Sequence, residues 1–138
     1  MAKTSKRRIG DLGEDVACRW LEGRGYKVVE RNYLKPWGEI DIVAQKASRL
    51  YFVEVKTACL PTRQVSRESQ NISGSREIYR PEENVHPAKL KRLHRAVQTY
   101  LLDRKVAENR EWQIDVACVY LDFSTRKARV ELLENVIL

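Results

Sequence analysis

Apolar side chains recur at helical spacing in two segments of the chain, and five shorter segments carry them in the pattern of strands. The first helical stripe, within residues 9–24, comprises Ile9, Leu12, Val16, Ala17 and Trp20. The second follows Pro87, which suits the first turn of a helix, and comprises Leu90, Leu93, Val97, Tyr100 and Leu101. Strands are expected at residues 26–33, 39–45, 50–57, 112–122 and about 127–133. The order α-β-β-β-α-β-β predicts an α/β fold, with a mixed central sheet of about five strands flanked by helices.

The chain of 138 residues has the length of one domain. We therefore expect a single domain over residues 1–138, with residues 60–85, which lack apolar periodicity, forming a mobile loop within it. Apolar residues make up 43% and charged residues 33% of the composition, which excludes a wholly disordered or fibrous protein. No apolar run approaches the roughly 20 residues that span a bilayer, and the three cysteines are far apart. A cytoplasmic protein with free thiols and no membrane association is the expectation.

The chain is basic, and its excess charge is clustered. It carries 26 Lys and Arg against 19 Asp and Glu, a net charge of +7. Residues 1–8 hold four positive charges and no negative one, and residues 86–105 hold six against Asp103 alone. Such clustering favours a nucleic acid as partner. The candidate nucleic-acid-binding residues on the second predicted helix are Lys89, Lys91, Arg92 and Arg95. The alternative is an ordinary solvated helix face.

The strands at 39–45 and 50–57 form a hairpin if the chain turns at Ala47 and Ser48. The resulting pairs are Gln45–Leu50, Val43–Phe52, Asp41–Glu54 and Glu39–Lys56, and the resulting apolar face comprises Ile40, Ile42, Val53 and Val55. Asp41 and Glu54 then stand opposite each other, with Cβ atoms about 5 Å apart. Two carboxylates at that distance repel unless a cation lies between them or one is protonated.

A divalent cation, Mg²⁺ or Mn²⁺, is therefore the expected cofactor, because Mg²⁺ takes one or two carboxylates together with water and phosphate oxygens. Lys56, one strand repeat beyond Glu54, would stand beside it and orient or deprotonate a water. An acidic pair, a lysine and a basic surround suit phosphodiester hydrolysis. The alternative is a solvated polar face on which Glu39 pairs with Lys56.

The segment Gly38-Glu39-Ile40-Asp41, followed by Phe52-Val53-Glu54-Val55-Lys56, resembles the PD-(D/E)xK nuclease signature. Further matches are Gly10-x-x-Gly13-Glu14-x-x-Ala17, Arg31-Asn32 and Trp112-x-Ile114-Asp115-Val116. With them the chain resembles the YraN-like family of small bacterial proteins, which is related to Holliday-junction resolvases. The resemblance implies a restriction-endonuclease-like fold. It also implies that Asp41, Glu54 and the carbonyl of Val55 are metal ligands, that Lys56 assists the attacking water, and that Glu14 is a further acid of the site. Without the resemblance, Glu14 is equally well explained as an acid favourable to the helix dipole.

The leading hypothesis is a metal-dependent endonuclease that acts on branched or structured DNA. Symmetric cutting of a junction would require a homodimer. One alternative is a nucleic-acid-binding module that has the fold without catalysis. Another is a protein-interaction domain for an acidic partner. Trp37, just before the acidic motif, could stack on a base, although plain packing also explains it.

Overall fold

The computed structural model describes residues 5–60 and 87–136 of the chain. Its elements are α1 (Ser5–Gly23), β1 (Lys27–Lys35), β2 (Gly38–Lys46), β3 (Arg49–Cys59), α3 (Pro87–Asp103), β4 (Trp112–Asp122) and β5 (Lys127–Leu133). This order confirms the predicted α/β class. The first helix begins earlier than its apolar stripe, at Ser5, and β1 extends to Lys35. Apart from Leu60, the predicted loop at 60–85 lies outside the described residues.

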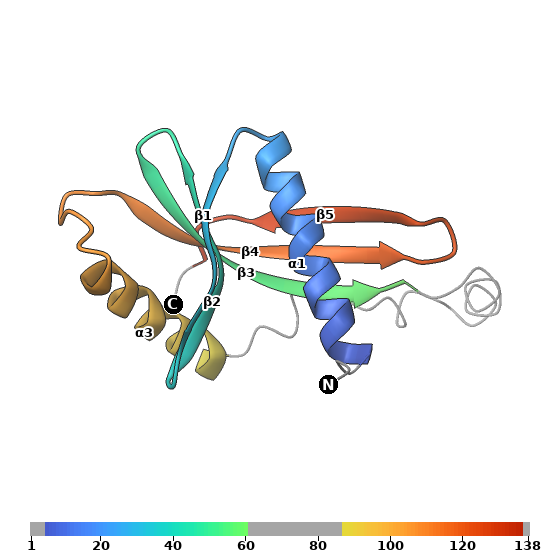
Figure 1. The fold of residues 1–138 in the computed structure, drawn as a ribbon, viewed down its shortest axis with the longest axis horizontal. Coiled ribbons are helices and arrows are strands. Elements are labelled where there is room, and N and C mark those ends of the chain that lie inside the picture. The colour runs from blue at the N-terminus through green and yellow to red at the C-terminus, as the bar shows by residue number, and fades with distance from the viewer. Residues whose placement is uncertain (1–4, 61–86, 137–138) are drawn as a thin grey trace.

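The five strands form one sheet in the order β1-β2-β3-β4-β5. Neighbouring strands are antiparallel except β3 and β4, which are parallel. The two helices cover opposite faces of the sheet (Figure 1). Within the described residues, neither helix has the length and apolar character needed to cross a bilayer.

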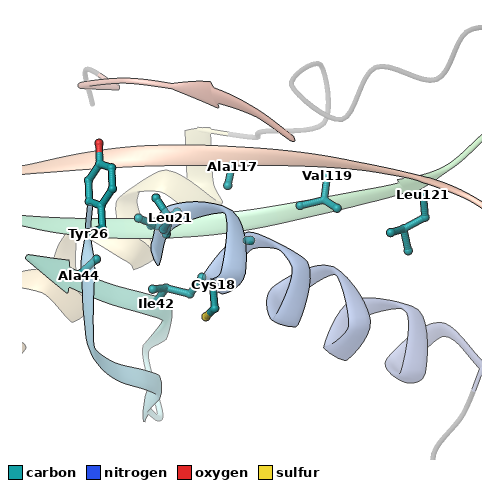
Figure 2. Close-up of a cluster of buried hydrophobic side chains, with 10 residues drawn as sticks. Cys18, Leu21, Tyr26, Ile42, Ala44, Ala117, Val119 and Leu121 are labelled. Carbon is teal, nitrogen blue, oxygen red and sulfur yellow. The ribbon is translucent and has the colours of Figure 1, made fainter. Parts of the chain in front are cut away.

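Two main hydrophobic clusters hold the helices to the sheet. The first joins α1 to the sheet and includes Leu21, Ile42 and Val119, all buried (Figure 2). The second joins α3 to the other face and includes Phe52, Leu93, Val97 and Tyr100. The predicted apolar stripes therefore face the core, except that Leu12 of the first stripe is exposed.

The β2–β3 hairpin turns as predicted, and its ladder contains the predicted pairs Gln45–Leu50 and Val43–Phe52. The ladder ends at Ile42–Val53, before it reaches the predicted Asp41–Glu54 and Glu39–Lys56 pairs. The two strands separate beyond that point, and each carries part of the candidate site.

The prediction that Ile40 shares the face of Ile42 was wrong. Ile42 packs in the α1 cluster, whereas Ile40 packs in the α3 cluster with its β1 partner Tyr33. The neighbouring strand is irregular beside this point, since Asn32, next to Tyr33, has a left-handed φ of 54°.

Two glycines allow the helices to approach the strands that carry the site. A Cβ on Gly13 of α1 would collide with the side chain of Thr57 on β3. A Cβ on Gly38 of β2 would collide with the backbone carbonyl of Arg92 on α3. Thus α1 packs closely against β3, and α3 packs closely against β2, where these two strands separate.

Candidate active site

A cavity of about 670 Å³ lies where β2 and β3 separate. Its walls come from α1, β2, β3 and α3. The lining residues are Lys6, Ile9, Gly10, Glu14, Glu39, Asp41, Glu54, Val55, Lys56, Thr57 and Lys89. The structure thus brings together the acids, the lysine and the Val55 carbonyl that the sequence singled out.

Asp41 occupies the point at which the ladder opens. Its side chain is 6% exposed, and its Oδ2 accepts a hydrogen bond of 2.8 Å from the backbone N–H of Val55. The carboxylate therefore replaces the backbone acceptor that a continued β2 strand would have supplied. Because a residue in an antiparallel ladder directs its N–H and C=O to the same neighbour, the Val55 carbonyl also faces this opening.

Burial first, and the nearby charge of Glu54 second, together raise the pKa of Asp41 to about 9. The hydrogen bond from Val55 opposes this shift but is outweighed. The protein thus holds a carboxyl group that, with no cation bound, keeps its proton at neutral pH.

Glu54 is 5% exposed and contacts two lysines. Its Oε1 lies 2.8 Å from Nζ of Lys89 and 3.4 Å from Nζ of Lys56. Burial, assisted by the neighbouring Lys89, lowers the pKa of Lys56. Burial also disfavours the charge of Lys89, but the hydrogen bonds to Glu54 and with Lys56 prevail and raise the pKa of Lys89. The two lysines are therefore unequal, with Lys89 the stronger base.

Lys89 lies apart from the other three basic residues of α3 that the sequence analysis named with it. Lys89 reaches into the cavity and pairs with Glu54, whereas Lys91, Arg92 and Arg95 are exposed along α3. Charge counting along the sequence could not separate these residues, because only the packing of α3 shows which side chain reaches the sheet.

Glu14 lies on the α1 wall of the cavity, and its side chain is 14% exposed. Burial raises the pKa of Glu14, although Arg31, whose Nη2 is 3.8 Å away, acts in the opposite direction. Arg31 binds Asp15 more closely, at 2.9 Å. The sequence did not predict Arg31 beside this acid, nor Lys6 on the cavity wall.

The donor set fits Mg²⁺ or Mn²⁺ rather than a structural zinc. Within residues 5–60 and 87–136, no three His, Cys, Asp or Glu side chains are grouped closely enough to enclose a metal. Mg²⁺ needs one or two carboxylates and completes its shell with water and phosphate oxygens. Asp41 and Glu54 would supply the carboxylates, and a cation between them would offset the burial and the charge of Glu54 that raise the pKa of Asp41.

Comparison with known proteins agrees with the resemblance seen in the motifs. Residues 13–119 match the family described as Uncharacterised protein family UPF0102. The chain is 38% identical over 131 residues to a UPF0102 protein of Moorella thermoacetica, an alignment that covers 95% of this chain and 96% of that protein. It is 41% identical over 132 residues to a UPF0102 protein of Beutenbergia cavernae, with 96% and 98% covered. Among solved structures, Pyrococcus furiosus SfsA in complex with Ca²⁺ is similar with a TM-score of 0.37 and 16% identity, over 94% of this chain and 63% of that chain. The extent of the family match and of the two alignments shows that the chain belongs to the UPF0102, or YraN-like, family.

Proposed function

We propose that the protein is a metal-dependent endonuclease that hydrolyses phosphodiesters in branched or structured DNA. The observation that carries the proposal is the convergence of Asp41, Glu54 and Lys56 on one cavity at the opening of the β2–β3 ladder. The alternative of a solvated polar face would leave both carboxylates in water, yet they are only 6% and 5% exposed. Burying two acids side by side costs free energy, and such perturbed groups are concentrated at functional sites.

The cavity supplies the groups that hydrolysis of a phosphodiester requires. Burial lowers the pKa of Lys56, which favours loss of its proton, and in its neutral form Nζ would accept a proton from the attacking water as the new P–O bond forms. The bond to the leaving oxygen breaks in the same displacement, and that oxygen takes a proton from solvent. Lys89, which stays cationic, can hold a non-bridging phosphate oxygen. Mg²⁺ or Mn²⁺ held by Asp41, Glu54 and the Val55 carbonyl would stabilise charge on the phosphate and lower the pKa of a bound water.

A cleavage assay tests the proposal. Junction, flap, single-stranded and linear duplex DNA are each incubated with Mg²⁺, Mn²⁺ or EDTA. We expect the wild type to cut a branched substrate in the presence of metal, and Glu54→Gln to lose this activity. Glu108→Gln, an exposed position after α3, is the matched control and should cut as the wild type does. Cleavage that persists in Glu54→Gln would refute the assignment of the site.

A second candidate function has one observation in its favour. Lys89 and Lys56 both lie against Glu54, so the site balances its own charge without a cation. A nucleic-acid-binding module without catalysis would show no cleavage. Its DNA binding would depend steeply on salt and would be unaffected by Mg²⁺ or by Glu54→Gln. Little affinity for DNA at near-physiological salt would instead favour a protein-interaction domain.

A further inference from the structure

A second cavity, of about 290 Å³, adjoins the candidate active site. It shares Glu39, Glu54 and Lys89 with the site and extends to the turn between β1 and β2. Trp37 and Leu34 contribute its apolar wall, and Leu34 is 70% exposed. A nucleic-acid strand bound at Glu54 would therefore meet an aromatic ring beside the reacting phosphate.

Trp37 is held rigidly. Its Nε1 donates a hydrogen bond of 3.1 Å to Oγ1 of Thr99 on α3, and the guanidinium of Arg95 lies over the ring, 5.0 Å from its centroid. The close approach of Gly38 to the backbone of Arg92 fixes the turn against the helix. A half-buried indole fixed in this way is a preorganised surface for stacking, because little side-chain freedom remains to be lost on binding.

The charges around the ring indicate which ligand would stack on it. Arg92 lines the cavity and Arg95 covers the ring, and both belong to the exposed basic face of α3. A flat aromatic ring flanked by arginines is the combination that binds a base together with its phosphate backbone. In a duplex each base is already stacked on both sides, so an unpaired base is the one that can accept the indole.

We propose that Trp37 stacks on an unpaired nucleobase next to the phosphodiester bound at Glu54, so that the substrate class is nucleic acid with a single-stranded segment at the cleavage point. This proposal rests on the proposed function for the identity of the bound phosphodiester. The stacking itself can be measured without cleavage.

The test compares affinities for a fluorescein-labelled oligothymidylate and for a blunt duplex, by anisotropy in EDTA. We expect Trp37→Ala to weaken single-strand binding roughly 5-fold to 100-fold, the range for loss of one base–aromatic stack, and duplex binding by about twofold or less. Trp20→Ala is the matched control, since Trp20 also lies beneath an arginine, with Arg24 4.2 Å from its ring centroid. Trp20 lines a different cavity, and its loss should leave both affinities unchanged.

Trp37→Phe separates stacking from a structural role. Phenylalanine keeps an aromatic face but loses the hydrogen bond to Thr99, so we expect it to retain most of the single-strand affinity. Equal losses in Trp37→Ala and Trp37→Phe, or equal losses on single strand and duplex, would overturn the inference.

Together with the binding measurements, the cleavage assay distinguishes a failure of the stacking inference from a failure of the nuclease proposal. Metal-dependent cutting by the wild type, with single-strand affinity unchanged in Trp37→Ala, would overturn the stacking inference alone. Absence of cutting on every substrate, with the Trp37→Ala binding defect present, would overturn the nuclease proposal alone.

Discussion

Replacing Asp41 by Asn should change how the stability of the metal-free protein depends on pH. Burial and the charge of Glu54 raise the pKa of Asp41 to about 9 from its ordinary 3.8. A carboxyl whose pKa is raised on folding stabilises the protein most below pH 3.8, and this stabilisation is lost as the pH rises toward 9. Asn cannot be deprotonated, and its side-chain oxygen can still accept the Val55 N–H. Asp41→Asn should therefore not lose this stabilisation as the pH rises.

The size of the effect follows from the gap between the two pKa values. Each pH unit between them is equivalent to about 1.4 kcal/mol. Because both about pH 5 and about pH 8 lie inside the gap, the free energy of unfolding of Asp41→Asn should rise relative to wild type by about 4 kcal/mol between them. Taking the difference between the two proteins cancels the titration of all other groups that the substitution does not touch.

Urea denaturation in EDTA at the two pH values measures this difference. Asp103→Asn is the control for which no change is expected, since the hydrogen bond from the Tyr33 hydroxyl lowers the pKa of Asp103 below its ordinary 3.8. The stability that Asp103 contributes is gained below pH 3.8, so the difference between Asp103→Asn and the wild type should be the same at both pH values. A constant difference for Asp41→Asn, or a fall with rising pH, would show that Asp41 is ionised in the metal-free protein and would refute the reasoning.

Three further outcomes are expected. Gly13→Ala should lower the free energy of unfolding in urea by about 1–3 kcal/mol, because its methyl group collides with β3. Gly10→Ala, whose Cβ meets nothing within 4 Å, should raise the free energy of unfolding by about 0.5–1 kcal/mol. Equal effects of the two substitutions would contradict the close packing of α1 on β3. Saturating Mn²⁺ or Mg²⁺ should raise the melting temperature of the wild type but not that of Glu54→Gln, and a shift in both proteins would place the metal elsewhere. The double variant Lys91→Ala/Arg92→Ala should reduce the slope of log K for DNA against log salt by about 2, and an unchanged slope would exclude this face of α3 from DNA contact.

The regular parts of the fold could be predicted from the sequence. Apart from the exposed Leu12, the predicted stripes of both helices face the core, and the hairpin register follows from alternation because a slip of one residue would bury polar groups. The residues that line the cavity could also be singled out from their type. Asp41, Glu54 and Lys56 interrupt otherwise apolar strands, and a charged side chain in such a strand needs a partner or a ligand.

The irregular parts could not be predicted in this way. Alternation assumes a continuous pleat, but Ile40 and Ile42 pack in opposite cores, and β1 beside them is irregular at Asn32, which has a positive φ. The ion pair between Lys89 and Glu54 could not be predicted either, because it depends on how α3 crosses the sheet. Nothing in the spacing of the lysines and arginines along α3 carries that information.

The end of the β2–β3 ladder shapes the candidate site. In a fully paired β2–β3 ladder, the N–H and carbonyl of Val55 would be bonded to the neighbouring strand and would be unavailable to a ligand. Because the ladder ends at Ile42–Val53, the Asp41 carboxylate takes the N–H and the carbonyl remains directed into the opening. The acid that ends the strand pairing is thus also the acid that faces Glu54 across the gap. A substitution that restored regular pairing here would improve the sheet and remove the site, which is why sequence rules that describe good strands fail at Asp41.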